Sequence, residues 1–577
     1  GILLASFTVL VISVVALRKF GGKNLSSWLG ENWRFMLFEE ALFLAVFVFS
    51  ALLRAGNPNI DGTEKPMELA FINAISQSQF FPPHDPWLSG YAISYYYFGY
   101  VMVAMLAKVT GTATSVAFNL AISLWYAMGA LGAFGIVHTL LTRLGAAARK
   151  VRWLALLAPL LIFLLGNAEG FLEVLHAGGV FWQSDPAGGL QSTFWTQLDI
   201  LELREPPSPP LDYLPKRDGG LVWWRASRVL SDYDNNGQWH EVIDEFPYFS
   251  LLLGDLHPHV LSIPFFLLAI GLAAGFYFKE PASISVQNSV QRLIRSADFW
   301  AASLVIGGMA FLNIWDFPTS AGLIAGGLAL REYQRSGKVF PALLGFIKMG
   351  LFFGLAGIAL YLPYFLGFSS QAGGLLPSMS FFTRGVHFWV MFATLLLPIL
   401  GYLVWRVNAE KRSAALATGL GQAALAVIGL LLLSYLASIL IVTLPGLING
   451  LLGADSPLGI KLQDAAGMFL NKQGAADLGS LLSATTVRRM VQPGGWLTIL
   501  VLGGLAMAVL KRKPVEIDAK APPLLEEDLP EKVDQPSPDK FAGLLVGIGL
   551  LVVGFPEFFY LMYFFGNRMN TIFKFYY

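Results

Sequence analysis

The chain has 577 residues, of which 55% are hydrophobic and only 13% charged, with a formal net charge of +1. Soluble domains carry about 25% charged residues, so most of this chain has no requirement to face water. The near-neutral charge gives no reason to expect a nucleic-acid partner. The absence of cysteine excludes disulfides, thiolate metal sites and a cysteine nucleophile.

The hydropathy pattern predicts an all-α integral membrane protein that crosses the cell membrane many times. Runs of about 17–25 apolar residues are typical of membrane helices. In chain order, such runs lie at roughly 2–17, 36–54, 95–110, 115–142, 151–167, 258–278, 299–314, 318–330, 341–366, 387–406, 416–445, 495–510 and 541–565. They predict about 12–14 transmembrane helices.

Basic residues in the short loops predict the orientation, because Lys and Arg concentrate on the inside. The outside loops are then residues 55–94, 168–257 and 446–494, and the segment after the last helix. The basic residues between 143 and 152 conflict with this alternation. Either a span is miscounted between Tyr95 and Gly166, or this basic cluster is an exception to the rule. The unusual length of the run at 115–142 favours a miscount.

Three domains are predicted. Residues 1–513 form the membrane core, residues 514–540 form an inside linker, and residues 541–577 form the last helix with an outside aromatic and basic segment. The linker is rich in Pro, Glu and Asp, a composition typical of disordered segments.

The first outside loop combines acidic residues, a proline-rich turn and a tyrosine triplet. Its candidate side chains are Asp61, Glu64, Glu68, His84, Asp85, Tyr95, Tyr96 and Tyr97. The stretch that begins at Pro66 has the periodicity of an amphipathic helix lying in the membrane interface. The alternative interpretation is that the acids are solvated and the tyrosines anchor the interface.

A second motif, GDLHPHV, precedes the predicted helix at 258–278. An extended chain places Asp255, His257 and His259 on one face. Imidazole and carboxylate groups together are suited to binding a divalent cation or to moving protons. A polar network or a contact with substrate is the alternative.

Two further motifs lie at predicted helix ends. NIWDFPT contains Asn313, Trp315 and Asp316, and the last segment contains Arg568, Asn570 and Lys574. A carboxylate at membrane depth is costly unless it is paired or faces a wet cavity, and outside cations are suited to a phosphate group. An interfacial turn and a snorkelling helix are the alternatives. Because the orientation places all four motifs on one side, we expect them to line one cavity at the membrane surface.

Five sequence motifs, in order along essentially the whole chain, carry a family resemblance. They are GTEKPME (62–68), FPPHDPWLSGYAISYYYFGY (81–100), GDLHPHV (254–260), NIWDFPT (313–319) and NRMNTIFKFYY (567–577). They resemble the "YYY" membrane proteins of Chloroflexi and archaea, a family described as a domain of unknown function. The opening order of helix, acidic outside loop, amphipathic stretch and aromatic turn is also distantly similar to the C-type (GT-C) membrane glycosyltransferases.

The second resemblance implies a GT-C-like architecture and a polyprenyl-phosphate-linked sugar donor. It implies that an acid of the first outside loop acts as base or orients the acceptor, with Asp61 and Glu64 at the matching positions and Glu68 and Asp85 as further candidates. The chain departs from the family in lacking the usual adjacent Asp-Glu pair, since Asp61 and Glu64 are three residues apart. The identity of the base is therefore open.

The leading hypothesis is a membrane glycosyltransferase that works at the outer membrane face. Its partners would be membrane lipid, the lipid-linked donor and an acceptor, and a divalent cation is its candidate cofactor. Arg568 and Lys574 would stabilise the phosphate leaving group, and the tyrosine triplet would shape the sugar pocket. Two hypotheses from other classes remain, a transporter or flippase for lipids or polar solutes and a non-catalytic subunit of a membrane complex.

Overall fold

The computed structural model describes residues 2–577 apart from 21, 187, 202, 208–222, 280–293, 371, 454–455, 512–535 and 564–565. The described part is built almost entirely of helices, which confirms the all-α membrane class. Among the described residues, seven helices are long and apolar enough to cross a membrane, or eight if the bent pair Leu478–Val491 and Gly494–Leu510 forms one span. This number is lower than the 12–14 expected from hydropathy.

The first half of the described chain holds the helices α1 (Ile2–Phe20), α2 (Gly22–Gly56), α3 (Lys65–Gln77), α4 (Phe98–Thr110), α5 (Thr114–Arg143), α6 (Ala148–Ala155), α7 (Leu157–Phe163), α8 (Glu169–Ala177), α9 (Thr193–Leu198), α10 (Pro247–Leu253) and α11 (Pro258–Phe278). The second half holds α13 (Ala297–Leu312), α14 (Asp316–Ser336), α15 (Val339–Leu360), α16 (Leu362–Gly367), α17 (Gly385–Ala409), α18 (Ser413–Leu452), α19 (Pro457–Lys472), α20 (Leu478–Val491), α21 (Gly494–Leu510), α22 (Pro538–Gly554) and α23 (Met569–Phe575).

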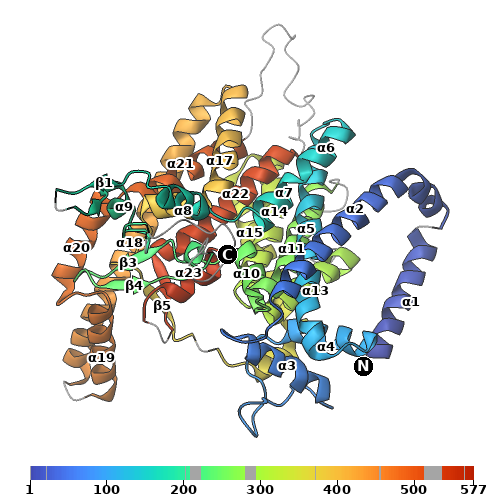
Figure 1. Ribbon diagram of the computed structural model, residues 1–577, viewed down its shortest axis with the longest axis horizontal. Coiled ribbons are helices and arrows are strands. Elements are labelled where there is room, and N and C mark those ends of the chain that lie inside the picture. The colour runs from blue at the N-terminus through green and yellow to red at the C-terminus, as the bar shows by residue number, and fades with distance from the viewer. Residues whose placement is uncertain are drawn as a thin grey trace.

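In the part of the chain that the structure describes, six short strands form three two-stranded antiparallel sheets. β1 (Gln183–Ser184) pairs with β2 (Leu190–Gln191), and β3 (Ser231–Tyr233) pairs with β4 (Trp239–Glu241). β5 (Leu375–Pro377) pairs with β6 (Phe559–Leu561), with Leu376 opposite Tyr560. The last pairing ties the chain after α22 to the segment before α17. Figure 1 shows the resulting position of the C-terminus, near the centre of the molecule beside α23 and α10.

The ends of several long helices meet on one side, which we call the basic face. The guanidinium of Arg143, at the end of α5, lies 4.4 Å from the ring centre of Phe278 at the end of α11. The hydroxyl of Tyr277 donates to the carbonyl of Ser537, just before α22. Arg406, near the end of α17, forms an ion pair with Asp539. The side of the molecule predicted to be inside is therefore a single face that includes Arg143.

Helix α4 explains the conflict in the predicted orientation. It has 13 residues and so measures about 20 Å, shorter than the roughly 30 Å hydrocarbon core. Directly after α4, the hydroxyl of Thr114 donates to Asn73 of α3, and Asn119 donates to the carbonyl of Pro58. Both ends of α4 thus lie beside the first predicted outside loop. The predicted span at 95–110 does not cross, and α5 alone runs from this loop to the basic face.

Close helix contacts in the membrane core use small residues. A Cβ atom added to Gly307 of α13 would lie 2.5 Å from the carbonyl oxygen of Gly357 in α15. Helices in lipid gain stability from such close backbone approach, because burial of apolar side chains from lipid gives little driving force. The α13–α14 hairpin and α15 are held together in this way beside α11.

The predicted linker at 514–540 lies almost wholly outside the described residues. Its last residues are described, because Ser537 precedes α22 and the helix begins at Pro538. The last membrane helix therefore begins three residues before the predicted start at 541. A proline at the first turn is compatible with a helix start, since the amide it lacks would have no intrahelical partner.

Candidate functional site

Helix α3 presents two acidic side chains on one side. Gly62 and Thr63 have positive φ angles of 67° and 51°, which turn the chain into the helix start at Glu64, and Pro66 fixes the first turn. Glu64 and Glu68 are four residues apart and so lie one above the other. Glu68 is fully buried, whereas the side chain of Glu64 is 57% exposed.

A four-residue connection faces this helix. Gly254 ends α10 with a φ angle of 74°, a conformation that favours glycine, and Pro258 opens α11. Only Gly254, Asp255, Leu256 and His257 lie between the two helices. The amide of Leu256 donates to the carboxylate of Glu68 at 3.2 Å, which fixes this connection against α3.

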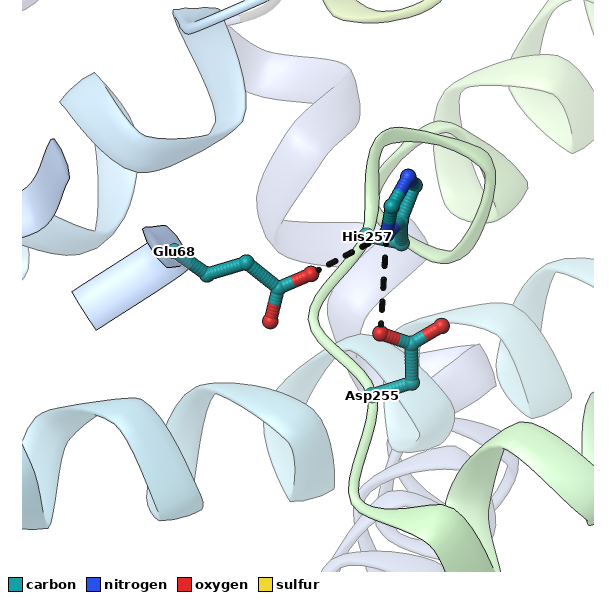
Figure 2. Close-up of side chains that lie close together, drawn as sticks. All are labelled: Glu68, Asp255 and His257. Atoms are coloured by element: carbon teal, nitrogen blue, oxygen red, sulfur yellow. Dashed lines mark ion pairs between the residues drawn. The ribbon is translucent and has the colours of Figure 1, made fainter. Parts of the chain in front are cut away.

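His257 joins the two acids of α3 to Asp255. Its Nε2 lies 3.0 Å from a carboxylate oxygen of Glu64, and its Nδ1 lies 3.2 Å from Glu68 and 3.8 Å from Asp255. Figure 2 shows Glu68 of α3 pointing toward Asp255 and His257, which both lie on the connection between α10 and α11. The hydroxyl of Tyr95 also lies 2.9 Å from Nε2. His257 of the GDLHPHV motif therefore contacts both acids of α3, about 190 residues earlier in the chain, and the first tyrosine of the triplet.

A second group shares Asp255 with the first. Nε2 of His259 lies 3.7 Å from the second carboxylate oxygen of Asp255 and 3.8 Å from Glu245. The carboxylate of Asp255 therefore points one oxygen toward each histidine. We call Glu68, Glu245, Asp255, His257 and His259 the histidine–carboxylate cluster. The sequence predicted a single group of Asp255, His257 and His259; the structure divides it into two groups.

Burial favours the protonated form of the three acids in the cluster. Burial, assisted by the nearby carboxylate of Glu64, raises the pKa of Glu68 to about 8. Burial and the charge of Asp255 raise the pKa of Glu245 to about 8. The pKa of Asp255 is raised well above its usual range by burial and by Glu68. Glu64 differs from these acids because it remains accessible to solvent.

The tyrosine triplet divides between polar and apolar surroundings. Tyr95 contacts His257, and the ring centre of Tyr96 lies 5.5 Å from that of Phe368. The ring of Tyr97 is buried and packs edge-on against Phe311 at 4.6 Å. Beside it lies an apolar pocket of about 300 Å³, whose lining residues are Phe81, Pro82, Tyr97, Phe98, Val101, Phe311, Pro363 and Tyr364. The triplet therefore connects the cluster to an apolar pocket.

The motif between α13 and α14 forms a tight polar turn. The side-chain amide of Asn313 donates to Asp316 at 3.0 Å. The ammonium of Lys574 makes cation–π contacts with two rings. Its Nζ lies 5.4 Å from the ring centre of Trp315 and 4.4 Å from the ring centre of Tyr563. Burial lowers the pKa of Lys574 to about 8, while the charge of Glu64 opposes that shift.

Helix α23 brings the C-terminal segment to the cluster. The ring centre of Phe573 lies 4.8 Å from that of His259, and the ring of Tyr577 lies 4.3 Å from it on edge. Lys574 follows Phe573 directly. All four motifs predicted to lie on one side of the membrane thus have members at or beside the cluster, which is at the opposite end of α11 from the basic face.

Arg568 has a different environment from the one expected for a phosphate ligand. Its guanidinium is fully buried, and two of its nitrogens bind the two carboxylate oxygens of Asp232 at 2.7 Å each. The third nitrogen donates to Glu557 at 2.9 Å. Because all three nitrogens already bind carboxylates, we correct the expectation for Arg568 and assign it a structural role.

Several other predicted residues lie away from the cluster. Asp85 accepts hydrogen bonds from the amides of Trp87 and Leu88 in its own turn. His84 is exposed, and its backbone forms an isolated antiparallel β-bridge with Ala92. These contacts make the pair part of a surface hairpin. Asp61 is exposed and Asn570 is half-buried, and the described contacts join neither of them to the cluster.

Glu245, Asp232 and Glu557 were not predicted as members of any site. Glu245 belongs to the acidic run before α10, and no spacing in the sequence distinguishes it from its neighbours. Its contact with His259, 14 residues further along, forms only in the folded chain. Asp232 and Glu557 likewise meet Arg568 only through tertiary structure.

Comparison with known proteins gives a family without an assigned activity. No curated protein and no solved structure matches the chain. A family model described as uncharacterized membrane protein (DUF2298) matches residues 1–577. The expectation of a membrane family of unknown function is thereby confirmed. Since the match spans the whole chain, the protein belongs to the uncharacterized membrane protein family DUF2298.

Proposed function

We propose that the protein is a membrane glycosyltransferase that takes a sugar from a polyprenyl-phosphate donor at the extracytoplasmic face. The observation that carries the proposal is the accessible carboxylate of Glu64, held 3.0 Å from His257 at the edge of a buried acidic cluster. Lys574 and the tyrosine triplet lie beside that cluster. Lys574 would contact the phosphate of such a donor, and the tyrosine triplet would contact its sugar and its apolar chain.

Glu64 is the best candidate for the base. A base must reach the proton it removes, and Glu64 is 57% exposed whereas Glu68 is fully buried. The contact with His257 would hold the carboxylate in one orientation. Asp61 is also exposed, but without such a contact it is free to turn away.

The proposed reaction is a displacement at the anomeric carbon. The acceptor hydroxyl oxygen forms a bond to that carbon, and its proton passes to the carboxylate of Glu64. The bond between the anomeric carbon and the phosphate oxygen breaks, and the polyprenyl phosphate leaves with the electron pair. Lys574 would stabilise the charge on this leaving group, since its ammonium contacts aromatic rings and no described carboxylate forms an ion pair with it.

The tyrosine triplet supports an amphiphilic donor. Tyr95 contacts the cluster, and Tyr97, two residues on, lines the apolar pocket. A polyprenyl chain entering that pocket would place its phosphate near Trp315 and Lys574, because Tyr96, between Tyr95 and Tyr97 in the chain, lies close to the indole of Trp315.

The side of the membrane follows from the basic face. Lys and Arg concentrate on the cytoplasmic side, and the basic face is at the end of α11, whereas His257 precedes its start. The 21 residues of α11 span about 30 Å. The cluster would therefore lie at the extracytoplasmic surface.

The direct test is sugar transfer in vitro by purified protein, with a panel of polyprenyl-phosphate sugars and membrane lipids as acceptors. Release of polyprenyl phosphate with one donor, lost in Glu64→Gln, supports the proposal. Absence of turnover with the whole panel, together with flux of a lipid or solute through reconstituted vesicles, would favour a transporter instead.

A further inference from the structure

If its three acids were ionised, the histidine–carboxylate cluster would carry more negative charge than the described ion pairs around it neutralise. Glu68, Asp255 and Glu245 are buried, and the described ion pairs of all three are with histidines alone. Ionised carboxylates are costly to bury unless they are paired or bind a metal. Three of them around two imidazoles therefore require protons or cations.

The first half of the cluster has the orientation of a metal site. Glu64 carries an acceptor carboxylate beside Nε2 of His257, which favours the tautomer with the proton on Nε2. The lone pair of Nδ1 then faces the carboxylates of Glu68 and Asp255. A histidine ligand that donates its other N–H to a carboxylate is the usual arrangement around bound metals. One oxygen of Glu68 also has no hydrogen-bond partner among the described residues.

The second half provides an independent observation. His259 is 7% exposed, and neither of its ring nitrogens has a hydrogen-bond partner among the described residues. Its Nε2 points toward Glu245 and the second oxygen of Asp255. In each half of the cluster, three ligand atoms lie within 4.8 Å of one another. Bonds of about 2.0–2.2 Å to one ion place neighbouring ligand atoms roughly 3–3.6 Å apart, close to the 3.2–3.8 Å separations observed.

We propose that the cluster binds two divalent transition-metal ions, with the carboxylate of Asp255 bridging them. The first ion would be held by Glu68 and His257, and the second by Glu245 and His259. Two imidazoles among carboxylates favour ions such as Mn²⁺ or Zn²⁺ over Ca²⁺, which prefers oxygen ligands alone. Two divalent ions would turn the charge of three carboxylates from −3 to +1, so the site would attract an anion.

This assignment goes beyond the proposed function, because its readout is ion binding and does not depend on sugar transfer. Purified full-length protein, stripped with a chelator and exchanged into chelator-free buffer, is titrated with Mn²⁺ while free Mn²⁺ is measured by electron paramagnetic resonance. We expect two bound ions per chain. Their spectrum should show exchange coupling, because carboxylate-bridged ions lie about 3.5–4 Å apart. One bound ion or none would overturn the two-ion assignment.

Variants distinguish the two halves. Glu245→Gln should leave one ion with an uncoupled spectrum, and Glu241→Gln, an exposed acid four residues away, should leave both. Retention of two coupled ions in Glu245→Gln would contradict the second half. Since a buried substitution can impair folding, the accessible Glu64→Gln provides a further check. It should weaken one of the two ions roughly 10–100-fold, and equal affinity for both ions in that variant would contradict the orientation proposed for His257.

Discussion

Arg568 and Asp232 are 336 residues apart in the chain and form a bidentate ion pair in the interior, with both nitrogen–oxygen distances at 2.7 Å. Glu557 binds the remaining nitrogen at 2.9 Å. The pair joins α23 to the β3–β4 hairpin, and α23 in turn carries Phe573 and Lys574 to the cluster. Arg568, predicted from the sequence to bind phosphate, thus instead anchors the segment that contains the other candidate phosphate ligand, Lys574.

We expect Asp232→Asn to destabilise the protein strongly. Removing one partner of a buried ion pair leaves the other charge uncompensated and costs about 3–5 kcal/mol. The thermal transition in detergent should fall well below that of wild type, whereas Glu241→Gln, which removes a solvent-exposed carboxylate paired with Arg228, should change it little. A transition in Asp232→Asn equal to that of wild type would show that Arg568 is not a structural anchor.

Replacing Glu64 by Gln should lower kcat for sugar transfer by about 10²–10⁴-fold, the usual contribution of a general base. KM for the donor should change little, because the carboxylate would act on the acceptor. Asp61→Asn is the matched control, since Asp61 is exposed in the same loop and lacks the contact with His257. If both variants keep wild-type turnover, Glu64 is not the base.

Binding of the lipid phosphate should weaken as pH rises through about 8. The pKa of Lys574 is lowered to about 8 by burial, so its ammonium loses its charge above that pH, where a lysine at its usual pKa would remain charged. Lys574→Arg should remove this dependence, because a guanidinium stays protonated in proteins. The measurement is the dissociation constant of polyprenyl phosphate between pH 7 and 9, with the neutral polyprenol as control. Identical profiles for wild type and Lys574→Arg would contradict this role of Lys574.

The apolar pocket beside Tyr97 gives a prediction about chain length. Val101 lines that pocket, so Val101→Trp should fill part of its volume. We expect KM to rise several-fold more for a long polyprenyl donor than for a short-chain analogue with the same phosphate and sugar. Equal changes for both donors would mean that the lipid chain lies elsewhere.

The absence of cysteine makes the topology of α4 directly testable. Single-cysteine variants at Ala113 and Ala146, exposed positions at opposite ends of α5, should label from opposite sides of the membrane. Ala113→Cys should react on the same side as a cysteine at Gly90, because α4 does not cross. Reaction of the cysteines at 90 and 113 from opposite sides would restore α4 as a membrane span.

The membrane class, the positions of the helices and the convergence of the motifs could be predicted from the sequence. Apolar runs determine which segments enter the lipid, and the placement of Lys and Arg determines their orientation. Both are local properties of the sequence. Local pattern also located α3 and the start of α11, because an amphipathic period begins at Pro66 and an apolar run begins at Pro258. Hydropathy could not show that α4 is too short to cross, because an apolar helix buried along one face has the same composition as one that spans.

Tertiary structure alone decided which charged groups meet. Glu245 joins His259, and Asp232 with Glu557 surrounds Arg568, through contacts that no local pattern encodes. The physical reason is that burial and pairing set the role of an ionisable group, and both depend on elements far apart in the chain. Sequence identified the residues that could bind an anion or a cation, and packing determined which of them remain available to do so.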